Sequence, residues 1–161
     1  MISEIMKAMI EFSNGNHHDI NHLIKVWCHS KTIGELENLD SKTQFILEIA
    51  AICHDIACPL CRQKYGNTNG KYQEKEGQIL VREFLAPFKL APKIVDRVAY
   101  LVGHHHTLDK IEGTDYQILI EADYLVNAQE SNYSHEAISN FAEHYFKTKT
   151  GKELLKSMYQ L

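Results

Sequence analysis

The chain has 161 residues, of which 44% are hydrophobic and 24% charged, and its formal net charge at pH 7 is −4. This size and balance fit one globular domain over residues 1–161 and exclude a disordered chain. A mild negative charge without a long basic run argues against a nucleic-acid coat or a polybasic membrane binder. No apolar run approaches the ~20 residues of a membrane span, and the first residues lack the apolar core of a signal peptide. We therefore expect a cytoplasmic protein that binds neither nucleic-acid polymers nor membranes.

Apolar residues recur with helical spacing along almost the whole chain, beginning with Ile2, Ile5, Met6, Met9 and Ile10. There is no sustained alternation typical of strands, no internal repeat and no break in composition. The pattern predicts an all-α fold, a compact bundle of about seven to eight helices. The expected helices cover residues 2–10, 19–36, 43–55, 73–85, 92–106, 116–129, 134–147 and 152–159.

The segment from Ile56 to Tyr72 interrupts this pattern with one proline, two glycines and two asparagines. We expect a long loop here, and long loops in compact domains are often functional. Its pair Cys58 and Cys61 has the spacing of a redox motif or of half a zinc site, but no second such pair exists. Two small residues lining a tight turn are the simpler interpretation.

Asp123 is the most informative single residue, because helical spacing places it on the same face as Leu119 and Val126. A carboxylate on an apolar stripe must be paired, protonated or bound to a metal. Glu121 has a more solvated angular position on the same helix. A salt bridge from Asp123 to a buried arginine is the alternative to metal binding.

Several histidines could share a site with Asp123. His54 and Asp55 end the most apolar helix and can reach one cavity, where a nitrogen and a hard oxygen suit Zn, Mn or Fe(II). His22 lies in the middle of an earlier helix. Each of these residues also has an ordinary interpretation: a hydrogen-bonded core histidine for His54 or His22, and the start of a turn for Asp55.

Three consecutive histidines, residues 104–106, end the helix that begins near Pro92. Successive side chains on a helix point about 100° apart, so at most two of the three face one cavity. Favourable interaction of cationic imidazoles with the helix C-terminus is the alternative explanation.

The order of these residues resembles that of the HD-domain superfamily of metal-dependent phosphohydrolases. An apolar helix ends in AAICHDI, which contains His54 and Asp55. His22 lies 32 residues before His54, and the motif EAD, which contains Asp123, follows on a later helix. The matching segments are DINHLIKVWCHSKTIGELENLD, QFILEIAAICHDIA, KEGQILVREFL, VAYLVGHHH and ILIEADYLVNA, and they span about residues 19–128.

The resemblance implies that one divalent ion, either Mn, Fe, Zn, Co or Ni, is bound by His22, His54, Asp55 and Asp123. It places His104 and His105 where other members of the family bind a second ion or contact phosphate. Members with a clear two-metal site have a histidine at the position of Gln73. The signature of cyclic-dinucleotide phosphodiesterases is absent after the histidines, where the sequence reads TLDKIEGTDY.

The function expected from this resemblance is hydrolysis of a small phosphorylated molecule, with a nucleotide as the expected substrate. The catalytic residues would be His54, Asp55 and Glu76, with Glu76 as a general base or simply a surface residue. Arg62, Lys64 and Lys71 would bind phosphate, unless they form a solvated basic surface. A di-iron oxygenase and a non-catalytic, metal-stabilised nucleotide sensor are the alternatives, and a homodimer is compatible with the sequence.

Overall fold

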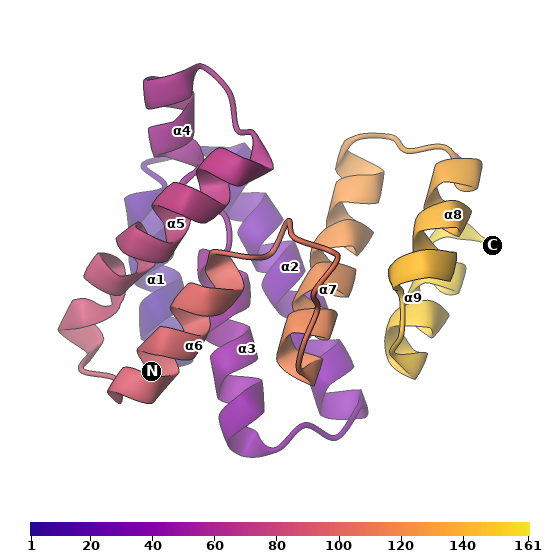
Figure 1. The fold of residues 1–161 in the computed structure, drawn as a ribbon, viewed down its shortest axis with the longest axis horizontal. Coiled ribbons are helices and arrows are strands. Elements are labelled where there is room, and N and C mark those ends of the chain that lie inside the picture. Colours follow the sequence, from indigo (N-terminus) through magenta and orange to yellow (C-terminus); the bar gives the residue numbers. More distant parts are fainter.

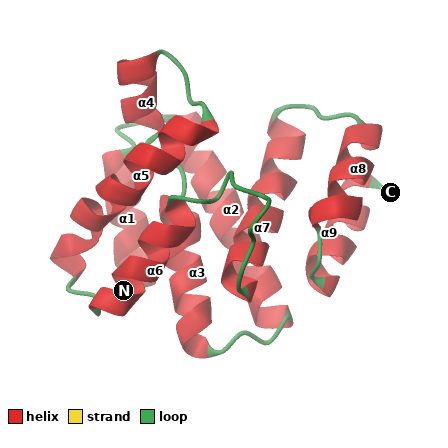
Figure 2. Ribbon diagram, viewed as in Figure 1, coloured by secondary structure: helices red, strands yellow, loops and turns green.

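A computed structural model describes all residues from Met1 to Leu161. It contains helices and no strands, as Figures 1 and 2 show. The nine α-helices and one 3₁₀-helix are α1 (Ile2–Phe12), α2 (His17–Leu36), α3 (Ser41–Cys53), α4 (Cys58–Tyr65), α5 (Gly70–Leu85), η1 (Ala86–Phe88), α6 (Pro92–Val102), α7 (Thr114–Glu130), α8 (His135–Tyr145) and α9 (Lys149–Tyr159). The predicted all-α fold is confirmed.

Helix α3 lies at the centre of the bundle, and α1, α2, α6 and α7 pack against it. Every residue of α3 from Ile46 to Cys53 is buried. The helix starts at Asp40, whose side chain accepts hydrogen bonds from the backbone N–H groups of Lys42 and Thr43. Because α3 is surrounded by other helices, the residues at its C-terminal end are carried into the interior.

Helix α7 packs along α2 and α3 and is almost as deeply buried. Gly113 precedes it with φ +82°, and a Cβ atom there would lie 2.7 Å from Arg97 and 2.8 Å from Asp115. Helices α8 and α9 cover α7 on the side away from α5 and α6 (Figure 1). A core of 30 buried hydrophobic residues joins these helices.

The segment predicted as a loop over residues 56–72 is partly wrong, because residues 58–65 form helix α4. Pro59 occupies its first turn, where a missing N–H costs nothing, and Gly66 ends it in the left-handed conformation with φ +71°. The rings of Tyr65 and Tyr72 stack with centroids 3.9 Å apart, which fixes α4 against α5. The proline and the glycine are therefore the boundaries of a short helix.

One stretch, Ser41–Tyr65, is long and apolar enough to cross a membrane by length and composition, with a mean hydropathy of 1.4 in its most apolar window. This stretch was not foreseen from the sequence. Of that window 72% is buried inside the bundle, and a core helix meets the same criterion.

Candidate metal centre

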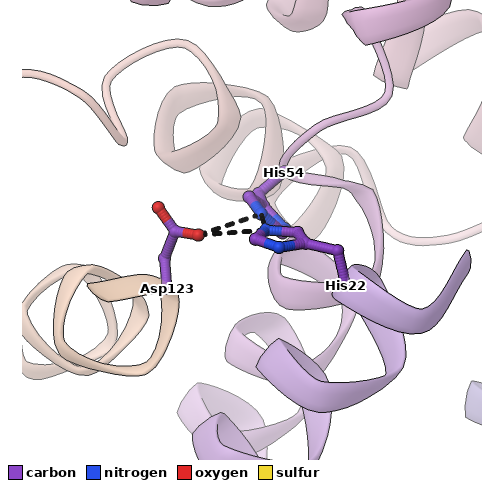
Figure 3. Close-up of side chains that lie close together, drawn as sticks. All are labelled: His22, His54 and Asp123. Atoms are coloured by element: carbon purple, nitrogen blue, oxygen red, sulfur yellow. Dashed lines mark hydrogen bonds and ion pairs between the residues drawn. The ribbon is translucent and has the colours of Figure 1, made fainter. Parts of the chain in front are cut away.

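Three side chains from different helices meet at one point in the interior (Figure 3). His22 lies on α2 and Asp123 on α7, and His54 is the residue that directly follows α3. The two Nε2 atoms of the histidines are 3.1 Å apart, and Asp123 Oδ1 lies 3.1 Å from His22 Nε2 and 3.4 Å from His54 Nε2. All three residues are buried, and Asp123 is the most exposed of them at 8%.

The other ring nitrogen of each histidine fixes its orientation. His54 Nδ1 lies 2.8 Å from the carbonyl oxygen of Ala51, and His22 Nδ1 lies 2.8 Å from Glu130 Oε2. Because a carbonyl or a carboxylate can only accept, each Nδ1 must carry the proton and donate it. In the neutral rings, both Nε2 atoms therefore present lone pairs to each other and to the Asp123 carboxylate.

Three acceptors that face one another without a proton repel, so this arrangement requires a cation. In the metal-free protein a proton can supply the charge. Burial lowers the pKa of His22, but the hydrogen bond to Asp123 and the charges of Asp55 and Asp123 outweigh it and raise that pKa to about 9. A divalent ion fits as well, since two ligands about 2.1 Å from one ion at tetrahedral or octahedral angles lie about 3.0–3.4 Å apart.

Asp55 lies beside this group and joins it to a third histidine. Its Oδ2 is 3.5 Å from His22 Nε2 and 3.7 Å from His54 Nε2, whereas its Oδ1 is 3.5 Å from His105 Nε2. His105 is buried and its Nδ1 donates to the carbonyl of Val102, so its Nε2 also presents a lone pair, and it has no hydrogen-bond partner. Asp55, His105 and His106 form a second group that could hold a metal ion.

The alternative explanation of Asp123, a salt bridge to an arginine, does not agree with the structure. The chain has three arginines, and each pairs elsewhere: Arg62 with Asp19, Arg82 with Asp96, and Arg97 with Asp115. Burial would raise the pKa of Asp123, but the neighbouring imidazoles of His22 and His54 outweigh it and hold that pKa well below its usual range. The carboxylate is therefore ionised and free of arginine.

A cleft of about 200 Å³ opens over the two groups, and we call it the polar cleft. It is lined by His18, Asp19, His22, Asp55, Cys58, Arg62, Thr68, Gln73, His106, Asp123, Asn127, Glu130 and Ser131. The Gln73 amide donates to the carbonyl of Thr68 at 2.8 Å, while its buried Oε1 has no partner. Gln73 thus brings an unused acceptor to the wall of the cleft.

Of the predicted phosphate-binding cations, Arg62 is the one that lines the polar cleft. Lys64 does not, because its Nζ pairs with Glu76 at 2.8 Å. Glu76 also accepts from Tyr65 at 2.6 Å, and these two donors lower its pKa. Glu76 thus joins α4 to α5 and lies outside the polar cleft, so the structure does not bring it together with the residues of the metal centre. Lys71 is exposed in the first turn of α5 and lies outside the cleft.

The pair of adjacent histidines at the site is His105 and His106, which corrects the prediction for His104. The His104 ring stacks on Tyr100 at a centroid distance of 4.2 Å, and its Nδ1 donates to the Tyr100 carbonyl at 2.7 Å. These contacts with Tyr100 hold the His104 ring in the turn that follows α6, where it lines neither cavity of the site.

Two residues of the site were missed from the sequence, Asn127 and Glu130. The Asn127 amide donates to Asp123 Oδ1 at 2.8 Å, and Glu130 accepts from His22 and from Lys25. Together with Asp123 they follow the spacing i, i+4 and i+7 along α7, so one helix face carries all three. That polar stripe was the signal available in the sequence.

The cysteine pair, expected to line a tight turn, lies on helix α4 in this structure. Cys58 and Cys61 are free thiols, both buried on α4. Burial raises the pKa of Cys58, and the neighbouring carboxylate of Asp55 raises it further. Since the thiolate is the reactive form, the site disfavours thiol chemistry.

The sequence model of the HD domain matches residues 19–152. The chain belongs to the HD-domain family. The match begins in the first turn of α2 and ends within α9, so it contains every residue of the two groups described above. Among curated proteins, none matches the chain.

Two solved structures share this HD-domain fold. One is a predicted HD superfamily hydrolase from an uncultured Thermotogales bacterium, with a TM-score of 0.72 and 22% identity over 98% of this chain and 84% of the other. The second is the Lin1889 protein from Listeria innocua, with a TM-score of 0.60 and 18% identity over 99% of this chain and 92% of the other. At these identities the likeness concerns the fold.

Proposed function

We propose that this HD domain is a metal-dependent phosphohydrolase that acts on a small phosphorylated molecule, with a nucleotide as the favoured substrate. The observation that carries the proposal is the set of lone pairs on His22, His54 and Asp123 that face one another 3.1–3.4 Å apart. The similarity to a predicted hydrolase of the same superfamily supports the same reaction class.

The charge of the polar cleft supports a metal-dependent reaction on an anion. Four carboxylates line it, those of Asp19, Asp55, Asp123 and Glu130, against the single guanidinium of Arg62. An anionic phosphate is repelled by such a cleft unless a cation offsets the carboxylates. Binding of a divalent ion would therefore make the cleft able to accept a phosphate.

In this proposal His22, His54, Asp55 and Asp123 hold the ion. A bound divalent ion lowers the pKa of water and stabilises charge on a phosphoryl oxygen. Asp55 lies between the two groups and is ionised, because the neighbouring histidines His54 and His105 outweigh the effect of burial and lower its pKa. In this proposal its carboxylate orients a water in the cleft, and Arg62, which pairs with Asp19 at the cleft wall, exchanges that partner for a phosphate oxygen.

The test combines turnover and metal content on the same samples. Nucleoside monophosphates and other phosphate esters are assayed with purified protein, with chelator-treated protein, and after return of Mn, Fe, Zn, Co or Ni. We expect turnover that chelation removes and one of these metals restores. Arg62→Ala should lower kcat/KM about ten- to a hundredfold with metal content unchanged. Arg82→Ala, which removes an arginine paired on the surface, is the matched control.

Two results would contradict the proposal. Bound metal without turnover of any phosphate ester would favour a non-catalytic sensor. Two irons with an optical signature and consumption of oxygen would favour an oxygenase.

A further inference from the structure

A second cavity of about 520 Å³ adjoins the polar cleft, and we call it the aromatic chamber. It lies between α7, α8 and the segment that follows α6. Its apolar walls are Leu108, Ile120, Tyr124, Tyr133, Ala137 and Phe141. This volume is within the ~300–1,000 Å³ of typical small-molecule sites.

The aromatic chamber and the polar cleft meet at the candidate metal centre. His106, Asp123 and Asn127 line both cavities. A molecule with its phosphate at the metal centre can therefore extend an attached group directly into the chamber.

The walls of the chamber suit a flat, uncharged group. The rings of Tyr124 and Phe141 stack on each other, with centroids 3.7 Å apart and an interplanar angle of 5°, so together they form one flat-sided aromatic wall, and the ring of Tyr133 stands 5.9 Å from that of Tyr124. The lining has no lysine, arginine or glutamate, and its ionisable side chains, His105, His106 and Asp123, belong to the metal-centre end. A charged group would lose its hydration there without gaining a partner.

We infer that the aromatic chamber binds the planar aromatic group of the substrate, such as a nucleobase, while the phosphate lies in the polar cleft. The phosphate half of this inference rests on the proposed function. Aromatic side chains bind bases by stacking, whatever the base, because every base has a π-face. Tyr133 lines the chamber and is 43% exposed, so part of its ring is free to stack on a base.

The experiment measures binding of adenosine, a neutral nucleoside without phosphate, by titration calorimetry on the full chain. Ala137→Phe fills the chamber from the first turn of α8, where Ala137 is exposed and the new ring can be accommodated. We expect it to raise the Kd for adenosine at least about tenfold, and Tyr133→Ala to raise it severalfold. Glu143→Phe adds the same ring on an exposed site of α8 outside the chamber and should leave the Kd unchanged.

Equal adenosine affinity in wild type and Ala137→Phe would overturn the inference, as would binding of hexanol with no binding of adenosine. Turnover separates this failure from that of the proposed function. If glycerol phosphate and adenosine monophosphate are hydrolysed equally well, and equally in Ala137→Phe, the hydrolase stands and the chamber assignment fails. If adenosine binds in the chamber but no phosphate ester is hydrolysed, the chamber assignment stands and the proposed function fails.

Discussion

Helix α7 carries two buried carboxylates two residues apart, and their surroundings are opposite. Glu121 is fully buried and accepts hydrogen bonds from the Gln117 amide at 2.7 Å, from the backbone N–H groups of Lys147 and Thr148 at 2.7 and 3.0 Å, and from the Thr148 hydroxyl. Asp123 has one uncharged donor, the Asn127 amide, and otherwise faces the ring nitrogens of His22 and His54.

The difference separates a structural carboxylate from a ligand. All the donors to Glu121 except the Gln117 amide come from the connection between α8 and α9, so this carboxylate fastens that connection to α7. The groups around Asp123 are acceptors as well, and they need an added cation. Both carboxylates are buried, so burial does not tell their roles apart. The number of hydrogen-bond donors that reach each carboxylate does.

The largest expected effect is the loss of metal binding in Asp123→Ala. Removal of this carboxylate leaves the metal ion with one protein ligand fewer beside His22 and His54. We therefore expect metal affinity to fall at least about a hundredfold. Metal content by mass spectrometry after dialysis measures the change. Wild-type occupancy in this variant would remove Asp123 from the ligand set.

Glu121→Ala should distinguish the role of Glu121 from that of Asp123, because it should lower the stability of the fold without changing metal affinity. The variant leaves two backbone N–H groups and the Thr148 hydroxyl without their acceptor, and buried unsatisfied donors cost about 1–3 kcal/mol each. We expect the free energy of unfolding to fall by about 2–4 kcal/mol. Urea unfolding measures it, with metal content of the folded protein as the control, which should equal that of wild type.

A smaller effect is expected from Glu130→Gln. Glu130 accepts from His22 Nδ1 at 2.8 Å and so holds the ring with Nε2 towards the cluster. Loss of such an outer carboxylate lowers metal affinity about 10- to 100-fold. Titration calorimetry measures the Kd, and Glu136→Gln, on the exposed first turn of α8, is the control. An unchanged Kd in Glu130→Gln would show that the ring keeps its orientation without this contact.

The metal-free protein should also show a pH dependence of its stability. The pKa of His22 is raised to about 9 in the fold, against about 6.5 in an unfolded chain. Such a shift stabilises the fold fully below pH ~6.5, and the contribution is lost as the pH rises through about 9. We expect the free energy of unfolding of the chelated protein to fall by up to about 3 kcal/mol between these values. His105 shifts in the same direction and adds to the fall.

Protein loaded with metal should show a flatter profile, because the ion replaces the proton as the cation of the cluster. Chemical unfolding at several pH values, with chelator and with metal, compares the two. Identical slopes would mean that the ion does not bind where the proton does.

The helical fold could be predicted from the sequence because apolar spacing reports which faces are buried, and the order of His22, His54, Asp55 and Asp123 identified the family. The positions of Glu121 and His104 could not be predicted. Glu121 looks solvated on its own helix, but donors from residues 147 and 148, far along the chain, bury it. His104 depends on contacts with Tyr100 that decide which of three adjacent rings turns inward.

The segment after Asp55 was misread for a related reason. Pro59 and Gly66 indicate a break in helical structure, and the sequence does not show whether they end one long loop or bound a short helix. The stacking of Tyr65 on Tyr72 and the pairing of Lys64 with Glu76 decide it. Those contacts also remove two predicted site residues from the cleft.

The most direct test of the metal centre is a crystal structure of the protein soaked in Mn²⁺, with anomalous difference maps. The account predicts a peak in contact with His22 Nε2, His54 Nε2 and Asp123 Oδ1, and no peak at Glu121. A map without a peak at the cluster, with the histidines and Asp123 in the arrangement of Figure 3, would contradict it.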